Sequence, residues 1–181
     1  RVITDHIRST TFMVGDGVLP SNSGRGYVLR RLLRRAIRYC KNIGLETVEL
    51  SAVAKIFIEK IYDTAYPLLV EKKDYILEEI QKECKKFEAT LASGMKEFEK
   101  AIIGMERKNA FMSQKDANYI PETEISGKQA FRLYDTFGFP LELTEELAIE
   151  KGLTVDKKGF DEAFRLQELF FRGQRDQLYQ C

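Results

Sequence analysis

The sequence predicts an all-α protein, a multi-helix domain in which a long spine helix links two helical lobes. Apolar residues recur at spacings of three and four through most of the chain. Glycine and proline separate these stretches. One periodic stretch, about 72–108, is longer than a compact domain of 181 residues needs. We therefore expect a first lobe over 1–109, spine included, and a second lobe over 110–181.

The first three expected helices precede the spine. Residues 2–16 carry Ile3, Ile7 and Val14 at helical spacing, and glycines follow at 15 and 17. A glycine-rich turn at 20–26 opens the second helix, which we expect to stop near Gly44. The third expected helix covers 48–64 and ends before a Tyr-Pro pair.

The spine is predicted from nine apolar positions between Ile76 and Met105, spaced by three or four residues. At 1.5 Å per residue such a helix is roughly 50 Å long. A self-associating coiled coil is the alternative interpretation. Isoleucine, cysteine and phenylalanine fill the first apolar positions, in place of the repeated leucine of a coiled-coil seam, so the linking role is favoured.

The second lobe begins after a polar, aperiodic stretch at 106–125, which we expect to be a loop or a small irregular or β insertion. Ser126 and Gln129 match a capping box, which predicts a short helix ending at Gly138. The next helix begins at or before Thr144 and runs to Gly152.

A last helix is expected from Asp156, its N-cap, to about Tyr179. Val155 precedes the cap and Phe160 follows it in the first turn, the spacing of a hydrophobic staple.

Composition is that of an ordinary globular protein, with 44% hydrophobic and 31% charged residues and a net charge of +1. No apolar run approaches the about 18 residues of a membrane span. Cys40, Cys84 and Cys181 form neither a disulfide framework nor a zinc spacing, so a reducing, cytoplasmic setting is expected. The chain begins with Arg1 and ends inside an amphipathic pattern, which suggests a fragment of a longer protein.

Catalytic patterns are not apparent in the sequence. The pair Gly24-x-Gly26 is too short for a dinucleotide fingerprint, and no Gly-Lys-Ser or Gly-Lys-Thr loop occurs. His6 is the only histidine, and we interpret it as a hydrogen-bonded packing residue. Acidic pairs such as Glu145-Glu146 are interpreted as solvated decoration. We therefore expect no enzymatic activity from this chain alone.

The second helix carries the most informative pattern. On a helical projection its arginines fall within an arc of about 140°, and leucines occupy the opposite arc. No acidic residue occurs between Asp16 and Glu46. Arginine suits bidentate binding of phosphate, so this face predicts a polyanion partner. Alternatives are a scaffold that binds an anionic membrane or an acidic protein, and an RNA binder indifferent to sequence. The arginines of this face are Arg30, Arg31, Arg34, Arg35 and Arg38.

Three motifs in order resemble the alanyl-tRNA synthetases: residues 1–9 with 16–31, residues 130–144, and residues 150–156. The resemblance implies a helical middle domain, between a class II core that activates alanine with ATP and Mg²⁺ and an editing domain that holds Zn²⁺. It implies no cofactor in this chain itself. Its implied partners are the acceptor stem of alanine tRNA and those two domains, with no membrane.

The resemblance also implies site residues. Asn22 and Asp135 match the positions that read the G·U wobble pair of alanine tRNA. The resemblance implies that this domain also orients the 3′ end of the tRNA for alanylation. In a wobble pair the guanine 2-amino group points into the shallow minor groove of A-form RNA, where a carboxylate can accept from it. An amide such as that of Asn22 can both donate and accept. The alternatives are a turn role for Asn22 and backbone donors for Asp135.

The resemblance further implies that arginines hold the stem phosphates, with pairing of some of them to carboxylates of the catalytic core as the alternative. Departures from the family pattern are small: Ser23 replaces a frequent acidic residue, Phe137 a tyrosine, and Leu141-Glu142 a Val-Asp pair. The implied phosphate-binding residues are Arg25, Arg30, Arg31, Arg34 and Arg35.

Overall fold

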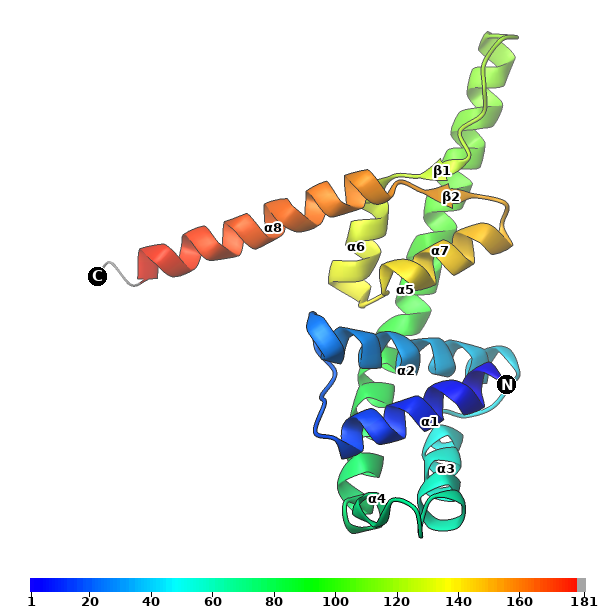
Figure 1. Ribbon diagram of the computed structural model, residues 1–181. Coiled ribbons are helices and arrows are strands. Elements are labelled where there is room, and N and C mark those ends of the chain that lie inside the picture. The colour runs from blue at the N-terminus through cyan, green and yellow to red at the C-terminus, as the bar shows by residue number, and fades with distance from the viewer. Residues whose placement is uncertain (179–181) are drawn as a thin grey trace. The chain divides into compact units, whose positions relative to one another are not determined.

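The computed structural model describes residues 1–178 as helices joined by short connections and one pair of short strands (Figure 1). The predicted all-α class is confirmed. Tyr179 and Cys181, at the expected end of the last helix and beyond it, lie outside the described residues. Contacts divide the chain into two compact units, Arg1–Thr90 and one that starts at Leu91. This division precedes the boundary expected after residue 109 and falls within the long helix.

The first unit packs its helices around a common apolar core, in which α1 and α2 lie side by side (Figure 1). Its elements are α1 (Val2–Gly15), α2 (Gly24–Asn42), α3 (Val48–Ile56), the π-helix η1 (Phe57–Ile61), α4 (Pro67–Glu71) and the start of α5 (Lys73–Lys115). Its fully buried side chains include Ile7, Leu29, Leu33, Ile37, Ile58, Ile76, Ile80 and Phe87.

The first two helices agree with the sequence prediction, and the third differs from it. The predicted helix over 48–64 is α-helical only to Ile56 and continues as the wider turn of η1, which ends at Ile61. Tyr62 N donates to Phe57 O at 2.9 Å, an i to i−5 bond. Such a turn inserts one residue into the helical period, which spacing alone does not reveal.

The long helix α5 confirms the predicted spine but extends beyond it. Its apolar stripe is buried by the chain's own two units: Ile76, Ile80 and Phe87 in the first, and Phe98 and Ile102 in the second. A coiled-coil seam is therefore not needed to explain this stripe. The expected loop at 106–125 is wrong in its first half, because the helix continues to Lys115.

The second unit is built around two parallel strands, each of which leads directly into a helix (Figure 1). Glu124 pairs with Thr154 and Ile125 with Val155. The expected insertion thus contributes only its last two residues to a strand. The elements of this unit, besides the rest of α5, are β1 (Glu124–Ile125), α6 (Gly127–Phe137), α7 (Leu141–Glu150), β2 (Thr154–Val155) and α8 (Lys157–Leu178).

Predicted caps set the helix boundaries of the second unit. Ser126 and Gln129 form the complete capping box, and Gly138 ends α6 with φ 68°. Asp156 Oδ1 accepts from Gly159 N at 2.9 Å. Thr144 lies inside α7, fully buried, and does not cap it.

Two glycines let the first turns of α6 and α8 meet. A Cβ on Gly127 would lie 2.1 Å from Phe160 N and 2.2 Å from Gly159 C, both backbone atoms. We expect Gly127→Ala to lower the free energy of unfolding by about 1–3 kcal/mol, because the helices must separate. Urea unfolding measures this difference.

The matched control is Gly104→Ala in α5, where a Cβ meets nothing within 4 Å. It is expected to raise stability by up to about 1 kcal/mol through helix propensity. A Gly127→Ala variant as stable as the wild type would contradict the close helix contact.

Candidate nucleic-acid interface

The turn before α2 fixes the backbone around Asn22. Ser21 N donates to Gly26 O at 3.1 Å, and Ser21 Oγ donates to Ser23 O at 2.8 Å. A Cβ on Gly26 would lie 2.3 Å from Leu19 O, so only glycine admits this close approach. The turn that the sequence predicts is thus held against the first turn of the helix.

Asn22 itself is exposed and hydrogen-bonded to α2. Arg30 Nη1 donates to Asn22 Oδ1, and Arg30 Nη2 donates to Pro20 O at 3.4 Å. One guanidinium therefore contacts the turn at two points. The sequence singled out Arg30 as a phosphate-binding residue, and this contact with the turn was not predicted.

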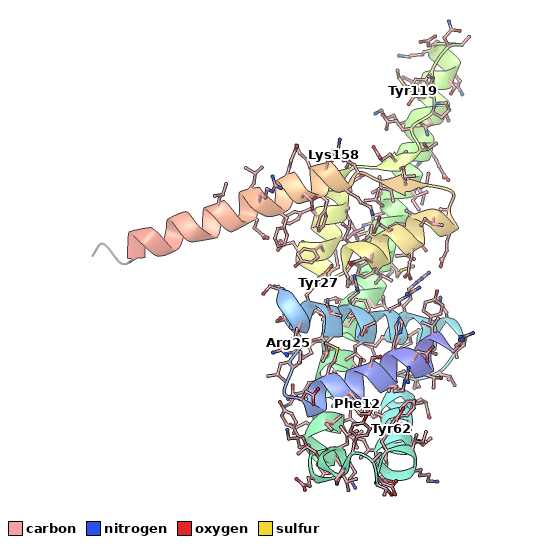
Figure 2. All side chains as sticks on the ribbon, viewed as in Figure 1. Phe12, Arg25, Tyr27, Tyr62, Tyr119 and Lys158 are labelled. Carbon is pink, nitrogen blue, oxygen red and sulfur yellow. The ribbon has the colours of Figure 1, made fainter. Side chains whose placement is uncertain are left out.

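The arginines of α2 differ widely in exposure. Arg25 is exposed at the start of the helix, near Tyr27 (Figure 2). Arg31 and Arg35 are half-buried. Arg34 and Arg38 are buried, with relative exposures of 8% and 4%. The arginine face expected from the helical projection is therefore not one continuous solvent surface.

A carboxylate of α5 explains the burial of Arg34. Glu83 is 2% exposed, and its Oε1 lies 2.7 Å from Arg34 Nε and 2.5 Å from Arg34 Nη2. The same oxygen forms an ion pair with Arg30 Nε at 3.4 Å. The Arg34 guanidinium also lies over the Phe87 ring, 4.9 Å from its centroid. No acidic residue lies near these arginines in the sequence. In the structure Glu83, which is distant in sequence, supplies a carboxylate to Arg34 and Arg30.

Lys41 and His6, both in this unit, have shifted pKa values. Hydrogen bonds with Glu88 and Glu46 raise the pKa of Lys41 to about 12. Burial lowers the pKa of His6, and the neighbouring charge of Arg35 lowers it further. His6 Nε2 is buried, and no hydrogen-bond partner for it is found in the described part of the chain, so the hydrogen bond expected for this residue is not seen at that atom.

Asp135 lies exposed in the last turn of α6. Its Oδ1 accepts a hydrogen bond from Gln167 Nε2, on α8, at 2.7 Å. The donor is a side chain of another helix, whereas the alternative sequence interpretation expected backbone donors. Gln167 was not predicted. Its signal is its spacing, three residues after Phe164 and seven after Phe160, on the side of α8 that contacts α6.

Aromatic packing holds α6 and α8 together beside Asp135. Tyr134 meets the rings of Phe160 and Phe164 edge to face, at 5.6 and 5.7 Å between centroids, and Phe131 contacts both. At the end of α6, Phe139 is fully buried against Gly94, where a Cβ would come within 2.5 Å of its ring. The backbone that carries Asp135 is therefore anchored on both sides.

The described residues show no metal-binding cluster and no membrane-spanning helix. They contain no cluster of three or more His, Cys, Asp or Glu side chains that could hold a metal ion. None of their helices is long and apolar enough to cross a membrane. Cys40 and Cys84 are buried free thiols, and burial raises the pKa of Cys84 to about 12.

The structure thus brings Asn22 together with Arg30, Glu83 and Arg34 in the first unit, and Asp135 together with Gln167 in the second. A family model described as tRNA synthetases class II (A) matches residues 1–177. The chain belongs to this family. The resemblance to a tRNA synthetase that the sequence motifs indicate is therefore confirmed.

The individual relatives that this chain matches belong to a narrower group of class II tRNA synthetases, the alanine–tRNA ligases. Alanine–tRNA ligase 1 of Lachnoclostridium phytofermentans is 43% identical over 178 residues. The alanine–tRNA ligases of Geobacillus kaustophilus and Geobacillus thermodenitrificans are 45% and 46% identical over 175 residues. Each alignment covers 97% of this chain and 18% of the relative, so the chain spans under a fifth of the length of these proteins.

Proposed function

We propose that this chain is the tRNA-binding middle domain of an alanyl-tRNA synthetase, which recognises the G·U pair of the alanine tRNA acceptor stem. One observation carries the proposal furthest. Both expected base readers are exposed, and at each the protein occupies one oxygen, through Arg30 at Asn22 and through Gln167 at Asp135. Each side chain is thereby oriented and keeps a polar atom for a ligand.

The roles of the two readers follow from their chemistry. The ionised Asp135 has only acceptor oxygens, so it suits the guanine 2-amino group that a wobble pair leaves without a partner. In a G–C pair that amino group is already bonded to cytosine. The expected preference is therefore for G·U.

We assign phosphate contacts chiefly to Arg25, Arg31 and Arg35, which are exposed or half-buried. Arg34 is bound by Glu83 inside the unit, and Arg30 spans Glu83 and the turn. Glu83 therefore engages the guanidinium groups of Arg30 and Arg34 inside the unit.

The catalytic steps belong, in this proposal, to other parts of a longer protein. A class II core would bind ATP with Mg²⁺ and alanine, and an editing domain would hold Zn²⁺. This chain would orient the 3′ end of the tRNA toward that core, in the cytoplasm. The complete protein would thus be an alanine–tRNA ligase.

Salt dependence of binding to an alanine-tRNA acceptor minihelix tests the proposal. We expect three single variants to weaken binding by the same factor on G·U and G–C stems: Arg25→Ala, Arg31→Ala and Arg35→Ala. Each should also reduce the magnitude of the slope of log K against log salt by about 1. The matched control is Arg8→Ala on α1, whose side chain is 48% exposed and pairs with Asp5.

Unchanged slopes in all three variants would contradict phosphate binding by α2. Anionic vesicles that compete equally with the minihelix would favour the membrane scaffold instead. Binding with a steep slope but no base preference would indicate a sequence-indifferent RNA binder.

A further inference from the structure

We propose that Arg30, held by Glu83, is a positioning residue that turns the amide NH₂ group of Asn22 outward as a hydrogen-bond donor. This inference rests on the proposed function, since it says which half of the Asn22 amide meets the RNA. It adds Arg30 and Glu83 to the determinants of specificity in a role other than phosphate binding.

The chemistry of the two groups fixes the orientation of the amide. A guanidinium group has donors only, so the Asn22 atom that contacts Arg30 Nη1 must be the oxygen. Nδ2 then occupies the other side of the amide. Asn22 is exposed, and no bond from its Nδ2 to another described residue is found. The atom left for a ligand is therefore a donor.

Arg30 is itself held in place, which gives the orientation its value. Its side chain is only 21% exposed, its Nε pairs with Glu83 Oε1 at 3.4 Å, and its Nη2 reaches Pro20 O at 3.4 Å. Glu83 is fixed in turn by two contacts from Arg34. The planar guanidinium group of arginine can contact the carboxylate and the turn at the same time through different nitrogens. A lysine ammonium group cannot make both contacts.

The two readers then have complementary chemistry. Asp135 presents an acceptor to the guanine amino group, and Asn22 presents a donor to an acceptor on the minor-groove edge. Uracil O2 is such an acceptor, and in a wobble pair it is displaced from the position of cytosine O2 in a G–C pair. An amide held as a donor therefore favours the base pair whose acceptor lies where the wobble places uracil O2, and so contributes to the preference for G·U. A freely rotating amide could present either its donor or its acceptor to the base pair.

The test compares Arg30→Lys and Asn22→Asp with the wild-type chain on G·U and G–C minihelices. Arg30→Lys retains the charge but frees the amide. Asn22→Asp retains an acceptor for Arg30 but presents an oxygen to the RNA. Both variants should lose most of a preference of about ten-fold, which corresponds to about 1.4 kcal/mol. Arg8→Lys on α1, exposed and outside the site, is the matched control for the arginine-to-lysine change.

A second measurement on the RNA-free chain separates this inference from the proposed function. In the ¹⁵N spectrum we expect resolved Nη signals for the restrained Arg30 guanidinium, and a changed Asn22 side-chain NH₂ signal in Arg30→Lys. An unchanged Asn22 signal, or a full G·U preference in Arg30→Lys, would overturn the positioning role. If the signal changes but the wild type binds both stems equally, base reading is what fails, and the orientation of the amide stands.

Discussion

Asp135→Asn is expected to abolish the preference of the chain for a G·U stem while leaving its affinity for a G–C stem intact or slightly raised. Gln167 Nε2 donates to Asp135 Oδ1, so an asparagine that keeps this hydrogen bond turns its only oxygen toward Gln167. Its NH₂ group then faces the guanine amino group, donor against donor. Leaving such groups unsatisfied costs about 1–3 kcal/mol, a range that includes the about 1.4 kcal/mol of a ten-fold preference for the G·U stem.

Binding of both minihelices to the variant checks this expectation. Removing a negative charge near phosphates strengthens the non-specific part of binding, so a loss restricted to G·U cannot come from charge. Asp161→Asn, an exposed position of α8 with the same change in charge, is the matched control. Equal losses on G·U and G–C stems would contradict the role of Asp135.

Glu83→Ala is expected to have the largest effect on stability, lowering the free energy of unfolding by about 3–5 kcal/mol. The substitution removes the carboxylate that binds the buried Arg34 and forms the ion pair with Arg30. Glu83 is 2% exposed, so water cannot replace the lost carboxylate without rearrangement of the unit. Urea unfolding of the chain measures the change.

The matched control for this prediction is Glu78→Ala, on the same helix and with the same change in helix propensity. Glu78 is 63% exposed and pairs with Lys82 at 2.9 Å, so its removal should cost less than about 1 kcal/mol. Similar small losses in both variants would mean that the buried cluster does not stabilise the first unit. Glu83→Gln, which keeps an acceptor, should fall between the two.

The parts of the fold that the sequence predicts are those with a buried stripe or a local cap. The helices α1 and α2 and most of α5 show helical spacing because one face is buried. The N-cap residues Ser126 and Asp156 mark the starts of α6 and α8. Residues 106–115 were missed because no side chain between 103 and 120 is buried, so that part of the helix has no apolar period.

The site was predicted only in part, since partners from distant helices are not a local property. Glu83 follows Ile76 by seven residues and Ile80 by three, so the period of α5 does place a carboxylate on its buried face. A buried carboxylate demands a cation, but the pattern does not say that Arg34 supplies it. Gln167 shares this property on α8: its spacing places it beside α6, and only the structure pairs it with Asp135.

Recognition of the G·U pair by this chain is tested most directly by its dissociation constants for two alanine-tRNA minihelices that differ only in that pair. Measurements at low and moderate salt separate base reading from phosphate binding. A preference of about ten-fold for G·U over G–C, or about 1.4 kcal/mol, at both salt concentrations is the predicted result. Equal affinities for the two stems would contradict it.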